Sequence, residues 1–302
     1  MSSPTIGAMV DELIELFRAQ GGLATSAQIL TYMPRRAFEA SVNSGALERI
    51  WQGIYCLGEP DDALRLRGLD LLCGRRVPVC LATAAAVYGF DTEDPAELHV
   101  LSPPGTHLRS ADGLVVHRRD DAPLRMVAER LTTAPNWTAV EVARALRRPR
   151  ALATLDAALR SGSCDRGGLR RAAREQWGRR GIVAVRDLIE FADPLSESPM
   201  ESEARLVMRD GGLPAPVLQY EVVDGNRELR RLDFAWPFAG VAAEYDGEAA
   251  HSGPDAMRRD RRRQAALQDI GWTVIPMLAE DVRRQPAALV ARIERQLLRR
   301  AA

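Results

Sequence analysis

Residues 232–246 read LDFAWPFAGVAAEYD, and this stretch decides the fold that we predict for the last third of the chain. Apolar side chains alternate with other side chains on both sides of Pro237–Gly240, which is typical of two strands joined by a tight turn. Leu232, Phe234 and Trp236 should therefore share one face. We predict an antiparallel hairpin whose other face carries polar residues.

The length of the turn predicts which residues lie opposite each other. If four residues close the hairpin, Trp236 pairs with Val241. In that register Asp233 lies directly opposite Glu244, with Cβ atoms about 4.5–5.5 Å apart, and Asp246 points the same way. Like charges placed opposite each other destabilise a sheet, so three carboxylates on one face indicate a bound cation. Oxygen ligands favour Mg²⁺ or Mn²⁺ over zinc.

Two alternatives to this metal site remain open. Arg231, which lies opposite Asp246 in this register, can join Arg230 and neutralise the carboxylates in a structural network of ion pairs. A shift of the register by one residue would place Asp233 and Glu244 on opposite faces and abolish the site.

The segment before the hairpin adds two more charged candidates. A helix is expected to begin at Pro199, because proline suits the first helical position, and to end at the glycines at 211 and 212. This helix carries Glu201 and Arg205. A strand over 217–223 connects it to the hairpin.

The segment after the hairpin is rich in arginine. A helix beginning at Pro254 carries five arginines over six positions, so some face the site and the others face solvent. They are Arg258, Arg259, Arg261, Arg262 and Arg263. We expect one or two phosphate contacts here, with Arg258 and Arg262 as the candidates. We expect two structural elements to follow: an apolar strand over 271–276 and a closing helix over about 286–300.

The first sixty residues have the order of elements of a winged helix. Three helices, over about 10–20, 27–32 and 34–43, precede two β-prone runs that flank Gln52-Gly53, a hairpin signal. In this order the third helix enters the major groove of DNA. The candidate DNA contacts are Arg35, Arg36, Asn43, Arg49 and Gln52. Protein docking is the alternative, because this segment contains more acidic residues than arginines.

The middle of the chain, 61–195, is predicted to be a mixed α/β connector. We expect a helix over 81–88, strands over 97–101, 114–118 and 129–133, and helices over about 136–147, 150–161, 167–176 and 182–192. His99 and His117 alternate with apolar neighbours, which favours structural strand residues over metal ligands. A turn-rich stretch over 193–199 marks the boundary with the last domain.

The composition excludes several classes of function. The 302 residues carry 41 basic and 41 acidic side chains, and every basic one is an arginine, which excludes catalysis by lysine. Four cysteines and four histidines show none of the spacings of a structural zinc site. No signal peptide is visible, and no apolar run approaches the ~18 residues of a membrane span. We therefore expect a cytoplasmic protein with no membrane partner.

The charge is balanced over the whole chain but not along it. Residues 144–186 contain twelve arginines and three acidic residues, whereas 187–250 contain fourteen acidic residues and five arginines. Clustered carboxylates need a cation or arginines to offset their repulsion, and arginine-rich flanks can hold a polyanion beside that cation. The alternative is that the basic stretch consists of ordinary solvated helix surfaces.

Two groups of motifs resemble known families. The pattern GGLATSAQILTYM…LERIWQGIYCLG is similar to the N-terminal domain of AbiEi-type antitoxins, in which this domain binds operator DNA. The motifs SPMESEAR, LDFAW, EYDGEAAH and DRRRQAAL…GW resemble the nuclease-like domain that ends many actinobacterial AbiEi-like proteins. That domain is related to very-short-patch-repair endonucleases and the PD-(D/E)xK superfamily. Together the two resemblances span nearly the whole chain.

The second resemblance implies roles for individual residues. Glu201 would be the acid on the first helix, Asp233 and Glu244 the metal ligands, and Asp246 would stand where the superfamily usually has a lysine. His251 has an ordinary pKa suited to proton transfer at neutral pH, although a surface-loop histidine is the alternative. Two further residues, Arg205 and Arg261, could stabilise charge on the phosphate, but a guanidinium is a poor proton acceptor.

These observations predict a chain of mixed α+β and α/β class in three parts. They are a winged-helix DNA-binding domain over 1–60, a mixed connector over 61–195, and a restriction-endonuclease-like three-layer domain over 196–302. The main hypothesis is a DNA-binding protein that cuts double-stranded DNA with Mg²⁺ or Mn²⁺ held by Asp233, Glu244 and Asp246. The alternative is a non-enzymatic AbiEi-type antitoxin and transcriptional regulator, which implies a cognate toxin as partner. A third option is a protein adaptor that uses the acidic block to bind a basic partner.

Overall fold

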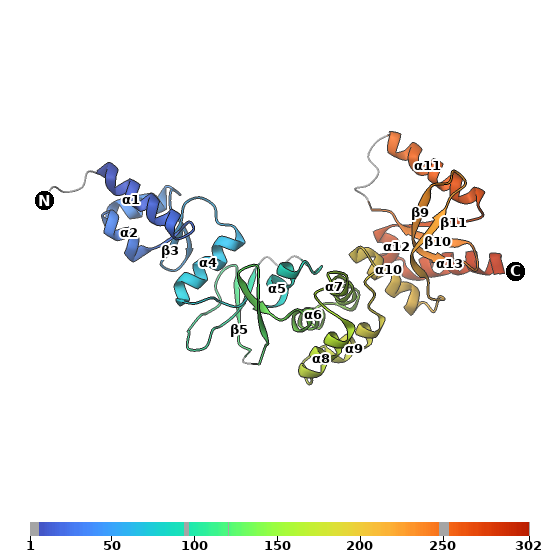
Figure 1. Cartoon of the computed structure of the whole chain (residues 1–302), viewed down its shortest axis with the longest axis horizontal. Helices are drawn as coiled ribbons and strands as arrows, with labels where there is room; N and C mark the ends of the chain where they lie inside the picture. The colour runs from blue at the N-terminus through green and yellow to red at the C-terminus, as the bar shows by residue number, and fades with distance from the viewer. Residues whose placement is uncertain (1–5, 94–96, 120, 248–253, 302) are drawn as a thin grey trace. The chain divides into compact units, whose positions relative to one another are not determined.

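The computed structural model describes residues 6–93, 97–119, 121–247 and 254–301 (Figure 1). The described residues form thirteen helices and four small sheets, which confirms a mixed α and β architecture. The chain divides into two compact units, one within 1–83 and 95–133 and the other within 84–94 and 134–302. Position 60 lies inside the first unit and position 195 inside the second, so the three-part division stays a prediction.

The first unit opens with three helices and a three-stranded antiparallel sheet whose strand order is β1-β3-β2. Its elements are α1 (Ile6–Ala19), β1 (Leu23–Thr25), α2 (Ser26–Tyr32), α3 (Arg35–Asn43), β2 (Glu48–Trp51) and β3 (Ile54–Cys56). The Thr25 hydroxyl accepts from the Gln28 amide while the Gln28 side chain accepts from the Thr25 amide, so a capping box starts α2. Pro34 is the N-cap of α3 rather than its first residue.

The core of this segment lies under α1, α2 and the sheet. It is built from Leu13, Phe17, Ala24, Ile29, Leu47 and Tyr55. The helix α3 has no fully buried residue, and it contacts the core through partly buried Phe38 and Val42. The Phe38 and Tyr55 rings meet edge to face with centroids 4.9 Å apart, which ties α3 to the strand β3.

The rest of the first unit contains one more helix and four short strands. They are α4 (Asp62–Cys73), β4 (Leu98–Leu101), β5 (Leu114–His117), β6 (Leu124–Val127) and β7 (Arg130–Thr133). Neither α4 nor β6 was predicted. The helix α4 begins at the N-cap Asp61 and ends at Gly74 in the left-handed conformation. His99 on β4 and His117 on β5 contact each other, Nδ1 to Nε2, at 2.9 Å.

The second unit contains helices that pack together, and α5 (Leu81–Tyr88) precedes them in the chain. The helices are α6 (Pro135–Ala143), α7 (Arg148–Arg160), α8 (Arg166–Glu175) and α9 (Ile182–Phe191). The buried Asp156 of α7 accepts from the Ser202 hydroxyl at 2.6 Å, from the Arg205 guanidinium at 2.7 Å and from the Asp193 amide at 2.8 Å. This carboxylate therefore fixes α10 (Pro199–Asp210), which carries Ser202 and Arg205, on α7.

The last part of the second unit is a four-stranded sheet with helices on both faces (Figure 1). Its elements are α10 (Pro199–Asp210), β8 (Val217–Val223), β9 (Leu229–Trp236), β10 (Val241–Tyr245), α11 (Pro254–Asp269), β11 (Thr273–Met277), α12 (Ala279–Arg284) and α13 (Pro286–Ala301). The strand order is β11-β10-β9-β8, and only β10 and β11 run parallel. No helix in the described part of the chain combines the length and the apolar composition that a bilayer span requires.

Each face of this sheet has its own core. Phe234 and Trp236 pack against apolar residues of α10, α12 and α13, whereas Ala235 and Ala242 pack against Leu267 of α11. The predicted alternation holds at these positions. It was wrong for Leu232, which packs with Ala235 rather than with Phe234. The physical reason is an interruption opposite Asp233, where Gln219 of β8 adopts a φ of 49° and the pairing of β8 with β9 skips one position.

Candidate functional site

The hairpin of β9 and β10 has the predicted register. Trp236 pairs with Val241 and Phe234 pairs with Ala243. Beyond these pairs, the Asp233 carboxylate accepts a hydrogen bond from the Tyr245 amide at 2.9 Å. Asp233, Glu244 and Asp246 line one pocket of about 430 Å³ on the side of the sheet that α11 covers. The structure therefore brings the three predicted carboxylates to one place.

The carboxyl group of Asp233 has a shifted acidity. Burial raises the pKa of Asp233 to about 6, and the nearby negative charges of Glu201 and Glu244 add to this effect. The Tyr245 amide and Arg263 lower the pKa but do not outweigh burial. The carboxyl group of Asp233 thus titrates closer to neutral pH than an ordinary aspartate, as a group suited to proton transfer does.

The partner of Glu244 is an arginine from α11. Arg263 donates from Nη1 to one oxygen of Glu244 at 2.6 Å and from Nη2 to the other at 2.5 Å. The same Nη2 donates to the Arg231 carbonyl at 3.3 Å. A bidentate fork of this kind is among the stronger hydrogen-bonded ion pairs in proteins. Both oxygens of Glu244 are therefore engaged.

Arg230 and Arg231, which were expected to neutralise the carboxylates, form ion pairs with other acidic residues. Arg230 pairs with Asp224 at 2.7 Å, and Arg231 pairs with Glu197 at 2.6 Å. That alternative was correct in expecting an arginine but wrong about which one. Side chains of successive strand residues point to opposite faces, and hairpin pairing alone does not place the helix that supplies the counter-charge.

Glu201 lies close to the site, whereas Arg205 serves another purpose. The buried Glu201 carboxylate accepts from the Glu197 amide and from the Gln219 side chain, both at 2.9 Å. Arg205 is buried against Asp156, and it also donates to the Phe191 carbonyl at 2.7 Å. Arg205 is therefore a structural residue of the contact between α7 and α10.

The other predicted residues of this site are distributed as follows. Asp246 lines the pocket, and its backbone amide donates to the Met277 carbonyl at 2.9 Å. His251 lies outside the described residues. Arg258, Arg261 and Arg262 have exposed side chains on α11, and the pocket is lined by their neighbour Arg263 instead.

The arrangement of donors does not fit a divalent metal ion. Within the described ranges, no group of three or more His, Cys, Asp or Glu side chains is placed to hold one. Glu244 has both oxygens on Arg263, and Asp233 accepts a backbone N–H. A hard cation needs several free oxygen ligands, so Arg263 would have to leave first. The described geometry accommodates a guanidinium at this place.

The five DNA contacts predicted within the first sixty residues all lie at the surface of the first unit. Arg35, Arg36 and Asn43 are exposed on α3, and Arg49 and Gln52 are exposed on the hairpin of β2 and β3. Arg35 donates to Glu39 one turn further along at 3.0 Å, a solvated pair that contributes little to stability. The two other arginines, Arg36 and Arg49, make no ion pair with any described residue.

The sequence interpretation missed the role of Arg263, although a signal was present. Arg263 precedes Leu267 by four residues, and Leu267 is fully buried under the sheet. Residues four apart share one face of a helix, so the apolar residue identifies which arginine faces the sheet. Asp156 was also missed, because a single acidic residue in a helix gives no signal of burial.

Comparison with known proteins supplies the family. Two curated relatives, both uncharacterised proteins from strains of Mycobacterium tuberculosis, are 54% identical to this chain over 265 residues. The aligned segment covers 88% of this chain and 97% of each relative. The chain belongs to their family. Residues 77–191 also match the family model of the AbiEi antitoxin C-terminal domain.

The match over 77–191 supports the AbiEi-type part of the resemblance, whereas the motifs quoted for it lie at 21–58, outside the matched segment. This AbiEi-type segment lies within the predicted connector over 61–195 and ends at the last residue of α9. The carboxylates of β9 and β10 lie beyond it, so the nuclease-like part of the resemblance stays a prediction.

Proposed function

We propose that this protein is a non-enzymatic, DNA-binding regulator of AbiEi type. The observation that carries the proposal is the fork of Arg263 on Glu244, which engages the carboxylate that a nuclease would need for its metal. The AbiEi-type segment over 77–191 supports the same conclusion from the family. A cognate toxin and a cytoplasmic location belong to this proposal.

The first unit supplies the DNA-binding part of the proposal. Its order of elements, α1-β1-α2-α3-β2-β3, is that of a winged helix, with α3 as the helix that enters the major groove. The lack of a buried residue on α3 supports this role, because such a helix can present most of its surface to DNA. Arg36 and Asn43 would contact DNA from the helix, and Arg49 and Gln52 from the wing.

A second function, a metal-dependent endonuclease, is favoured by one specific observation. Asp233, Glu244 and Asp246 share a pocket, with Glu201 near enough to raise the pKa of Asp233. The helix-flanked sheet of β8 to β11 supports a three-layer nuclease-like domain. Titration of Mn²⁺, followed by the loss of its free electron-spin signal, tests this function. Binding by the wild type that Asp233→Asn abolishes would favour the nuclease, whereas no binding supports the regulator.

Fluorescence anisotropy tests the main proposal. The full chain is titrated into labelled DNA from immediately upstream of its own gene, and into a coding fragment of equal length. We expect preference for the upstream fragment and a loss of about tenfold in affinity for Arg36→Gln, as a lost base or phosphate contact predicts. Arg18→Gln is the matched control, because Arg18 is an exposed arginine of α1 held by Glu15. Equal affinity for both fragments, or equal loss in both variants, would contradict the proposal.

A further inference from the structure

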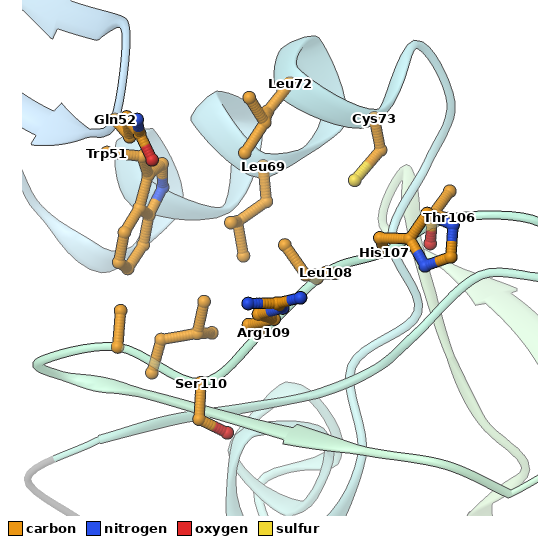
Figure 2. A pocket seen from close by; sticks show the side chains of 12 residues that line it. Trp51, Gln52, Leu69, Leu72, Cys73, Thr106, His107, Leu108, Arg109 and Ser110 are labelled. Atoms are coloured by element: carbon orange, nitrogen blue, oxygen red, sulfur yellow. The ribbon is translucent and has the colours of Figure 1, made fainter.

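The first unit contains a cavity whose lining residues, apart from Gln52, take no part in the DNA-binding proposal (Figure 2). Its volume is about 580 Å³, which lies within the ~300–1,000 Å³ typical of sites for small molecules. It is open to solvent on one side and lined by the end of β2, by α4, and by residues 106–111 and 114. No residue of the carboxylate site takes part in it.

Most of the wall of this cavity is apolar. Trp51, Leu69, Leu108 and Leu114 are each at least nine-tenths buried and line it, while Leu72 at its edge is 47% exposed. The Trp51 indole N–H donates to the Arg65 carbonyl at 2.8 Å, so the indole has no polar atom left for a ligand. Such a wall favours an aromatic or aliphatic body over a sugar or a nucleotide.

The opposite side of the cavity is positively charged. Arg109, an exposed residue, lines the cavity, and in the view of Figure 2 its guanidinium lies between Trp51 and His107. Among the described residues, no carboxylate pairs with Arg109 and no group accepts a hydrogen bond from its side chain. A guanidinium without a partner beside an apolar wall matches a carboxylate, which accepts two parallel hydrogen bonds from the fork.

The frame of the cavity is held in place by one residue. Arg65 of α4 donates to the Gly113 carbonyl at 2.8 Å, and its guanidinium carbon lies 5.3 Å from the centre of the Trp51 ring. Its own carbonyl accepts from Trp51. Because the three walls are joined through Arg65, the cavity is largely preformed, and binding costs little ordering of the protein.

The cavity reaches the proposed wing. Gln52 lines it, and this residue begins the turn between β2 and β3, next to an irregularity in the pairing at Arg49 and Trp51. A molecule that contacts Gln52 and Trp51 therefore touches the hairpin that carries two of the proposed DNA contacts. A ligand that favours one position of the hairpin shifts its population and changes DNA affinity.

We propose that this cavity binds an amphipathic carboxylate, a small molecule with one acidic group and an aromatic or aliphatic body, and that its occupancy alters DNA binding. Arg109 binds the acid and the leucines with Trp51 bind the body. The effect on DNA rests on the proposed function, whereas the binding of the acid does not.

Isothermal titration calorimetry on the full chain tests the site without DNA. The probes are naphthaleneacetate, phenylpropionate and octanoate, with naphthaleneacetamide as the neutral match of the first. We expect at least one acid to bind, and Arg109→Gln to weaken it by about tenfold while leaving the amide within about twofold, because only the acid makes charge-assisted hydrogen bonds. Arg118→Gln is the control, since Arg118 is an exposed arginine of the same unit outside the cavity.

The outcomes separate the site from the proposed function. No binding by any acid, or an equal loss in Arg109→Gln and Arg118→Gln, overturns the site even if the chain binds DNA. Binding of the acid that leaves DNA affinity unchanged overturns the coupling. A loss of DNA affinity in Arg109→Gln without any acid present assigns Arg109 to the DNA backbone and also overturns the proposal. Binding of the acid by a chain that binds no specific DNA supports the site and refutes the regulator.

Discussion

Replacing Asp233 by asparagine should stabilise the hairpin of β9 and β10 at neutral pH. Burial raises the pKa of Asp233 from an ordinary 3.8 to about 6. Above pH 6 the Asp233 carboxylate is ionised in the folded protein, where burial makes its charge less favourable than in the unfolded chain. The ionised carboxylate therefore lowers the free energy of unfolding by about 2–3 kcal/mol relative to a neutral group. Asparagine has no such charge, and its side-chain oxygen can still accept from the Tyr245 amide.

The sign of the pH dependence follows from the raised pKa. The contribution of Asp233 to stability is fully present below about pH 4 and is lost as the pH rises through about 6. Hydrogen exchange of the β9 and β10 amides, followed by mass spectrometry between pH 4 and 8, measures the local free energy of opening. We expect the local free energy of opening to be higher in Asp233→Asn than in the wild type at pH 7, and the two values to become similar near pH 4.

A matched control comes from the same sheet. Burial alone would favour the neutral form of Asp224, but hydrogen bonds from Arg230 and from the Glu228 and Asn226 amides lower the pKa of this carboxyl group. Asp224→Asn should therefore destabilise the sheet at pH 7, the opposite of Asp233→Asn. Equal or lower protection in Asp233→Asn at pH 7 would refute the inference that burial governs this carboxylate.

Three further substitutions test individual contacts of the fold. Arg205→Ala leaves the buried Asp156 without its counter-charge and should lower the free energy of unfolding by about 3–5 kcal/mol in urea titrations. Gly181→Ala places a Cβ 2.3 Å from the Arg144 carbonyl at a φ of +84°, so a clear drop in Tm is expected, and an unchanged Tm would contradict the geometry. Thr25→Val removes the hydroxyl of the capping box and should cost about 1 kcal/mol, measured by circular dichroism during thermal unfolding.

Much of the candidate site could be predicted from the sequence because the relevant constraint is local. A four-residue turn fixes the register of a hairpin, so the pairing of Trp236 with Val241 followed directly from Pro237–Gly240. Leu232 does not follow the alternation that this turn predicts. Its face depends on the neighbouring strand, where Gln219 adopts a left-handed backbone conformation that no residue pattern announced.

The partner of Glu244 could not be read from the hairpin alone. Five arginines in α11 wrap around the helix, and the choice of Arg263 depends on which side of α11 packs on the sheet. Tertiary packing of Leu267 makes that choice. The metal site was inferred from carboxylate repulsion, and an arginine distant in the sequence offsets that repulsion equally well.

Two elements of the first unit were missed for different reasons. The helix α4 has little amphipathic pattern, yet its ends carry clear signals in Asp61 and Gly74. The strand β6 is mostly exposed and pairs with β7 through a turn at Ala128 and Glu129, both with positive φ. Neither turn residue is a glycine or an asparagine, so the usual hairpin signal is absent.

The fate of bound DNA tests the central claim most directly. The full chain is incubated with a supercoiled plasmid that carries the upstream DNA, in Mg²⁺ and separately in Mn²⁺, and the samples are run on gels with and without removal of the protein. We expect a retarded plasmid that stays supercoiled after the protein is removed. Nicked or linear plasmid produced by the wild type, and not by Asp233→Asn, would contradict this expectation.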